Sequence, residues 1–173
     1  MSDIHQGISI TTVDATQTFP LGLEIEDPRG GAQKSANRFR YVKAGSAISA
    51  GNALVVSLAD ADEPNTLVPS SAANQVVTAI AEVAIASASF GWVQVRGRHA
   101  GVLKASGAAA AVAAGQALTT SGTAGALIPV AGDGDSNVTS TKLNAVIAMA
   151  AGIGVQALDS TDSNSALVEV IIT

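Results

Sequence analysis

The chain has 173 residues, enough for one domain or at most two. Hydrophobic residues make up 47% of it but aromatic residues only 3%, so a core must be built mostly from Ala, Val, Ile and Leu. The absence of cysteine excludes disulfides and a thiolate nucleophile, and the net charge of −5 argues against general nucleic-acid binding.

Residues 1–41 are predicted to form an extended N-terminal arm. Residues 7–13 are rich in β-branched side chains. Further along, Leu21, Leu23 and Ile25 alternate with Gly and Glu, which is typical of a half-buried strand. The apolar residues around Phe19 lie so far from the rest that we expect the arm to reach a sister subunit or a subunit of another protein.

A second alternating stretch follows at residues 38–42, with aromatic rings on one side and arginines on the other. Such a strand could stack bases and neutralise phosphate, but the negative net charge favours an edge that pairs with an acidic protein neighbour. The predicted interface residues in this part of the chain are Phe19, Pro20, Leu21, Arg38, Phe39, Arg40 and Tyr41.

Residues 42–173 are predicted to form an all-β domain, either a small β-barrel or a β-sandwich. Polar loops at 59–65, 132–137 and 159–165 separate short β-prone stretches, as in both architectures. The alanine-rich residues 108–114 favour at most one short helix.

A weak internal repeat divides this domain into two similar β-units. Residues 50–54 and 114–118 both contain Gly, an amide residue, Ala and Leu, and each half ends in an alternating valine pair. Chance similarity in a chain rich in Ala and Gly is the alternative. The predicted units are residues 42–97 and 103–173.

Trp92 is the main interface candidate of the domain. On a strand, Trp92, Gln94 and Arg96 share one face, while Val93 and Val95 share the other. The valine face is the predicted core, so Trp92 and Arg96 are expected on the exposed face as interface residues. Packing of the Trp92 ring under a loop of its own chain is the alternative.

Motifs for cofactor or metal binding fail on their context. Residues 152–157 have the spacing of a dinucleotide fingerprint, but a loop follows where a helix is required, which indicates a glycine kink in a strand. Residues 133–137 have the first spacings of a calcium loop, but Val138 and Asn144 stand where Gly and Glu are needed. We expect no cofactor and no metal.

The chain offers few parts for catalysis. His5 lies in the arm, and His99 lies in a predicted hairpin turn at 96–101. No G-x-S-x-G elbow is present, and no spacing singles out a carboxylate pair. We therefore expect no catalytic residue and no enzyme activity.

Charged residues make up 13% of the chain, against a usual share of roughly 25%. Because charge is depleted at the centres of protein–protein interfaces, the shortage favours a subunit of an assembly; a Ser/Thr-rich solvated face is the alternative. No apolar run approaches the ~20 residues of a membrane helix, and no signal peptide is recognised, so no membrane partner is expected.

Several short motifs resemble the head decoration (cement) proteins of tailed bacteriophages. The likeness spans roughly residues 19–130. Its motifs are Phe-Pro-Leu-Gly at 19–22, Phe-Arg-Tyr-Val-Lys-Ala at 39–44, Ala-Gly-Asn-Ala-Leu at 50–54, Gly-Trp-Val-Gln-Val-Arg-Gly at 91–97 and Ala-Ala-Gly-Gln-Ala-Leu at 113–118.

This resemblance implies a small β-barrel or β-sandwich, commonly a homotrimer. Such a protein is made in the host cytoplasm and sits on the outer surface of the virion, where it stabilises contacts between subunits of the major capsid protein. The group has no catalytic residues to carry over. A glycan-binding β-module of a virion or cell surface, and a self-assembling shell or tube protein, are the alternative functions.

Overall fold

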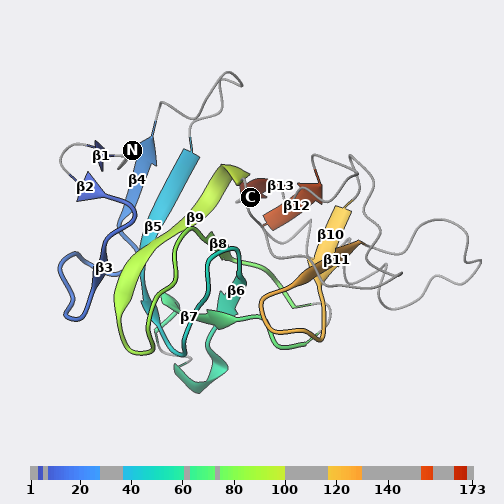
Figure 1. Cartoon of the computed structure of the whole chain (residues 1–173), viewed down its shortest axis with the longest axis horizontal. Helices are drawn as coiled ribbons and strands as arrows, with labels where there is room; N and C mark the ends of the chain where they lie inside the picture. Colours follow the sequence, from blue (N-terminus) through green and yellow to red (C-terminus); the bar gives the residue numbers. More distant parts are fainter. Residues whose placement is uncertain are drawn as a thin grey trace, which may run out of the picture.

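The computed structural model describes residues 4–5, 8–27, 37–60, 63–72, 75–99, 117–129, 153–157 and 166–170. Within these residues the chain is nearly all β, which confirms the predicted class (Figure 1). The helical structure described there is a single 3₁₀ turn, η1, at Leu58–Asp60. The expected helix at 108–114 and the rejected calcium loop at 133–137 lie outside the described residues.

The strands are short, as expected for stretches separated by polar loops. In chain order they are β1 (Ile4–His5), β2 (Ile8–Ser9), β3 (Val13–Asp14), β4 (Glu24–Asp27), β5 (Asn37–Ala44), β6 (Ala53–Val56), β7 (Thr66–Pro69), β8 (Ala79–Ala81), β9 (Phe90–His99), β10 (Ala117–Thr120), β11 (Leu127–Pro129), β12 (Ile153–Ala157) and β13 (Ala166–Val170).

Five of these strands pair in a closed ring. Strand β9 pairs with β8, β8 with β6 and β6 with β7, all antiparallel. Strand β7 then pairs parallel with β5, and β5 pairs antiparallel with β9. Because every strand of the ring has two neighbours, none of the five is an edge strand along its whole length.

The inner face of the ring holds an aliphatic core. Alternation along β5 directs Val42 and Ala44 inward, and alternation along β9 does the same for Val93 and Val95. Small side chains suit the short distance across so narrow a ring, which explains a core without aromatic rings. Its other buried members are Ile48, Leu54, Leu67, Ala79, Ala81 and Ile85.

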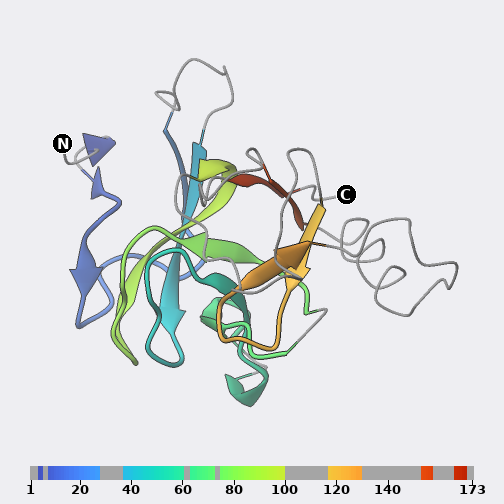
Figure 2. The same ribbon diagram turned by 45° about the vertical axis from the view of Figure 1, so that its right-hand side comes forward.

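A second core lies on the opposite face of β5 and β9. It is aromatic, and residues 8–27 cover it from outside. Strand β3 pairs with the start of β9, and β4 pairs with β5, so this N-terminal segment is part of the sheet and packs on its own chain. Figure 2 shows it on the opposite side of the molecule from β10 and β11.

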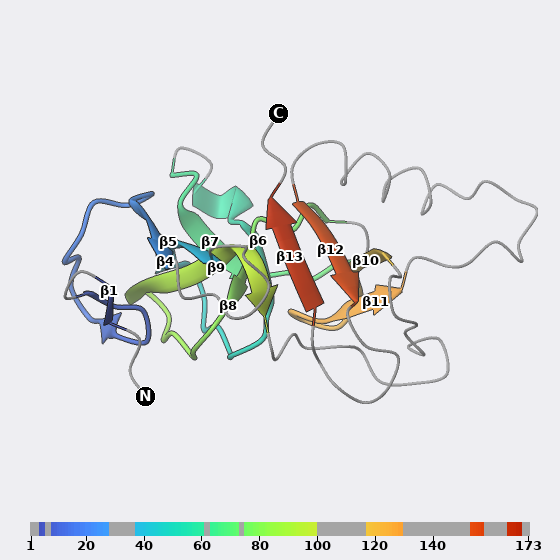
Figure 3. The same cartoon turned by 90° about the horizontal axis from the view of Figure 1, so that it is seen from above.

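Strand β9 connects the ring to the remaining strands. Its first part pairs with β5, and Gly97 to His99 pair with β13 (Figure 3). The predicted hairpin turn at 96–101 is therefore wrong for residues 96–99, which continue the strand. Gly97 has a φ of +105°, a conformation that side chains other than glycine rarely adopt, and it lies where β9 changes partners.

The strands beyond β9 repeat the order of those before it. Strands β7, β6, β8 and β9 are neighbours in that order, and so are β11, β10, β12 and β13, always antiparallel. Leu54 faces Pro69 in the first hairpin, and Leu118 faces Pro129 in the second. The unit boundaries 42–97 and 103–173 stay a prediction, because much of the second unit lies outside the described residues.

Candidate functional site

The three aromatic residues predicted as interface contacts on β5 and β9 are buried in their own chain. Phe39 is 2% exposed, Tyr41 0% and Trp92 1%. The predicted exposure of Trp92 is wrong, since both faces of β9 are covered: the valine face by the ring interior and the Trp92 face by the N-terminal segment. The alternation of residues along β9 does not show that the N-terminal segment, distant in the sequence, covers the Trp92 face.

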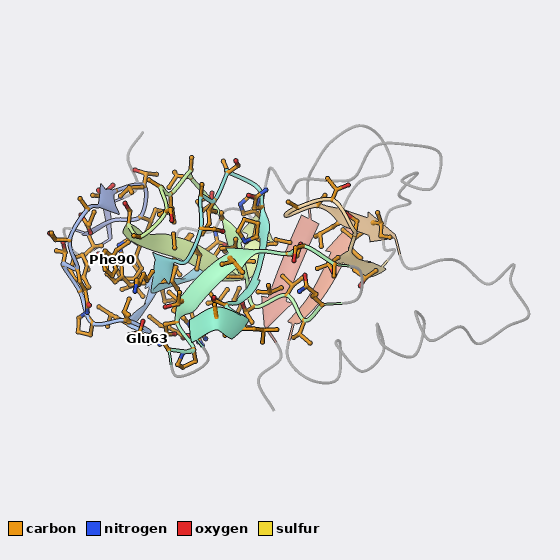
Figure 4. All side chains as sticks on the ribbon, turned by 90° about the horizontal axis from the view of Figure 1, so that it is seen from below. Glu63 and Phe90 are labelled. Atoms are coloured by element: carbon orange, nitrogen blue, oxygen red, sulfur yellow. The ribbon has the colours of Figure 1, made fainter. Side chains whose placement is uncertain are left out.

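All five aromatic rings of the chain belong to one cluster. Phe19 meets Tyr41 edge-on at a centroid distance of 5.2 Å and lies 5.5 Å from Trp92. Tyr41 lies 5.2 Å from Trp92 and stacks on Phe90 at 6.3 Å. Phe19 therefore packs on its own chain, although the sequence predicted that it lies too far out to do so, and its contact with another subunit stays a prediction. Figure 4 labels Phe90, another member of this cluster.

The hydroxyl of Tyr41 fixes the N-terminal segment to the ring. It donates a hydrogen bond of 2.7 Å to Asp14 Oδ2 and accepts one of 3.3 Å from the Thr18 N–H. Burial raises the pKa of Tyr41, and the hydrogen bond to Asp14 raises this pKa further. The backbone adds a pair of bonds, from Gly22 N to Tyr41 O at 2.8 Å and from Tyr41 N to Leu23 O at 2.9 Å.

The arginines predicted to meet an acidic neighbour find one in their own chain. Nε and Nη2 of Arg40 donate to Oε1 of Glu24 at 3.0 and 2.7 Å. Arg38 Nη1 lies 3.6 Å from the other oxygen of Glu24. The acid is thus supplied by β4, the strand next to β5.

Of the predicted interface residues, Pro20 and Arg96 are exposed. Leu21 is half-buried against the aromatic cluster with Phe19. The nine candidates are therefore not brought together into one surface: seven belong to the junction between the N-terminal segment and the ring.

An apolar groove on another part of the molecule went unnoticed in the sequence. It has a volume of about 340 Å³ and lies between the end of β6, η1 and the segment before β8. Leu58 is 88% exposed and Val76 45%. The signal in the sequence is Leu58 itself, a leucine immediately before the polar loop predicted at 59–65. The groove is lined by Val55, Val56, Leu58, Gln75, Val76 and Thr78.

His99 is buried, with Nε2 at 3.2 Å from Ala81 O and 3.7 Å from Glu82 Oε1.

Across the described ranges, no group of three or more His, Cys, Asp or Glu residues is placed to hold a metal ion. No helix in the described part of the chain is long and apolar enough to cross a membrane. Gly154 of the rejected dinucleotide motif lies in β12, where it pairs with Glu169, and Gly152 lies outside the described residues.

No family model, curated protein or solved structure matches this chain. The structure by itself shows the all-β class.

Proposed function

We propose that this protein is a decoration (cement) protein of a tailed-bacteriophage head, which binds the outer surface of the capsid as a homotrimer and stabilises contacts between major capsid protein subunits. One observation carries the proposal: three of the five motifs that resemble such proteins, at 19–22, 39–44 and 91–97, are distant in the sequence but neighbours in the fold.

The contacts between these motifs are specific. The N–H of Gly22 in the first motif donates to Tyr41 O in the second at 2.8 Å. Val42 of the second motif, on β5, pairs with Gly91 of the fourth motif, on the neighbouring strand β9. The third motif joins the ring where the N–H of Gly51 donates to Ala81 O at 2.8 Å.

The composition supports the same function. A decoration protein binds through many weak contacts that a symmetric shell repeats, so it needs a rigid body and broad, weakly charged surfaces more than a deep polar cleft. The closed ring of short strands supplies such a body. Because residues 8–27 pack on their own chain, the shell contacts are assigned to other surfaces, of which Arg96 is a predicted part.

The position of the aromatic rings disfavours the glycan-binding alternative. Sugar-binding modules stack their ligands on exposed rings. Here three of the five rings are buried, and Phe19 and Phe90 are half-buried against them. No exposed aromatic platform is left in the chain.

Sedimentation with empty heads tests the proposal. The purified full-length chain is mixed with expanded heads that lack it, prepared from the phage or prophage that encodes it, and centrifuged through a density gradient. We expect saturable binding, with density of threefold symmetry on the outer surface in cryo-electron micrographs. Unexpanded heads are the control and should bind less.

Two results would overturn the proposal. One is a chain that stays at the top of the gradient at low and moderate salt. The other is assembly of the purified chain alone into shells or tubes, which would favour the shell-forming alternative.

A further inference from the structure

The apolar groove forms where strand β6 extends beyond its neighbour β8. The last bonds between them come from Thr78, whose N–H and hydroxyl donate to Leu54 O at 2.8 and 3.2 Å. Strand β6 continues to Val56, but the preceding segment turns away, because the N–H of Gln75 donates to Thr120 Oγ1 of β10 at 2.7 Å. The two backbones separate and leave a wedge between them.

The floor of this wedge is an open strand edge. Ser57 N donates to Thr66 O at 2.9 Å and Ser70 N to Ala53 O at 2.9 Å, so the odd-numbered residues of β6 face β7. By alternation, the N–H and C=O of Val56 point into the wedge. Among residues 75–78, the bonds to this edge are the two from Thr78 to Leu54 O, so no group in that segment bonds to the backbone of Val56.

Two of the side chains that line the wedge are apolar and exposed to solvent. Leu58 on η1 and Val76 on the opposite wall are two of the four large hydrophobic residues exposed in the described part of the chain. Two exposed branched side chains beside an unpaired strand edge are the features used when an extended peptide adds a strand to a sheet: main-chain bonds give affinity and the apolar pocket gives specificity.

The charge of the surrounding chain selects the occupant. Residues 44–95 contain no Lys, Arg or His, but they contain Asp60, Asp62, Glu63 and Glu82. Three of these acids lie within five residues after Leu58 in the sequence. The Glu63 side chain, labelled beside η1 in Figure 4, is 53% exposed and lies 3.8 Å from Lys43 Nζ, which offsets part of the negative charge. A second copy facing the groove with the same patch would bring these acids together, whereas a basic segment would be attracted.

We propose that this groove binds an extended segment of a partner protein in which branched apolar residues are flanked by Lys or Arg. The segment adds a short strand to β6 at Val56, places an apolar side chain between Leu58 and Val76, and directs its basic residues to the acidic stretch after Leu58. This binding does not require the partner to be a capsid subunit.

A titration followed by amide NMR spectra tests the proposal on the full-length chain. The probe is an acetylated and amidated pentapeptide of sequence KVIVK; the matched peptides EVIVE and KSTSK lack the basic flanks and the apolar centre, respectively. We expect saturable shifts at residues 55–58 and 75–78 with KVIVK, and binding weaker by about tenfold or more with each matched peptide.

Two exposed substitutions give a second readout without threatening the fold. Leu58→Ser and Val76→Ser should each weaken KVIVK binding by about tenfold. Val13→Ser, at a valine 39% exposed on strand β3, is the matched control and should bind like the wild-type chain.

Three outcomes would overturn the proposal. They are the absence of saturable shifts at these residues, equal binding of KVIVK and EVIVE, and concentration-dependent shifts of the same residues without peptide. The last outcome would assign the groove to a second copy of this chain.

Discussion

Tyr41 shows how one residue can serve two parts of the molecule. Its ring lies at the centre of the aromatic cluster, and its hydroxyl bonds to Asp14 and Thr18 of the N-terminal segment. The sequence predicted that Phe39 and Tyr41 share one face of a strand, and this is correct for the buried cluster that they form together. What the sequence could not show was that residues 8–27 would cover that face.

The raised pKa of Tyr41 predicts a loss of stability in alkali. The unfolded chain ionises this hydroxyl near the ordinary tyrosine pKa of 10.0, but the folded chain holds it neutral to a higher pH. Its contribution is therefore fully present below about pH 10 and is lost as the pH rises through the folded pKa. Urea denaturation from about pH 8 to about pH 11 measures this fall in unfolding free energy.

Tyr41→Phe is the control, because it keeps the ring and removes the ionisable hydroxyl. This variant should lose about 1 kcal/mol at neutral pH and show a smaller alkaline decline than the wild-type chain. Tyr41 is the sole tyrosine, so the ultraviolet absorbance of tyrosinate reports it directly. An ordinary midpoint near pH 10 in the folded protein would contradict the prediction.

At the scale of elements, the turn between β10 and β11 is held against the ring by Gly125. Its N–H donates to Ser70 O at 2.7 Å and its carbonyl accepts from Ala53 N at 2.8 Å. The φ of +68° and the nearness of the Asn52 side-chain amide leave no room for a Cβ atom. Glycine is therefore required here for both conformation and space.

Gly125→Ala should lower the free energy of unfolding by at least about 2 kcal/mol, because it combines an unfavourable left-handed conformation with overlap against Asn52. Gly122→Ala in the same turn is the matched control: a Cβ there meets nothing within 4 Å, so the change should stay within about 0.5 kcal/mol. Urea denaturation of both variants measures the difference. Equal stabilities would show that the turn is not held as described.

At the scale of the whole molecule, the chain has two cores that share the strands β5 and β9. The closed ring encloses the aliphatic core by itself. The aromatic core is complete only with apolar side chains of the N-terminal segment, namely Ile8, Ile10, Phe19, Leu21 and Ile25. This segment is consequently a structural part of the molecule.

Removal of residues 1–23 should expose Trp92 and shift its fluorescence to longer wavelength. The loss of four apolar side chains from the cluster, Ile8, Ile10, Phe19 and Leu21, should cost on the order of 3 kcal/mol or more of unfolding free energy. Full-length protein carrying Thr12→Ala and Thr16→Ala, both at exposed positions of the segment, is the control and should keep the native emission. A truncated chain with unchanged emission and stability would refute the predicted role of the segment.

The sequence by itself determined the β class, the aliphatic character of the inner core and the faces shared by alternating residues such as Val93 and Val95. These properties are local, since period-2 alternation and side-chain size act within one strand. Only the tertiary structure decided that the Trp92 face is buried, that β7 meets β5 to close the ring, and that Gln75 bonds to Thr120 across 45 residues and opens the groove. Such contacts join segments far apart in the chain, so no local pattern records which segment covers a given face.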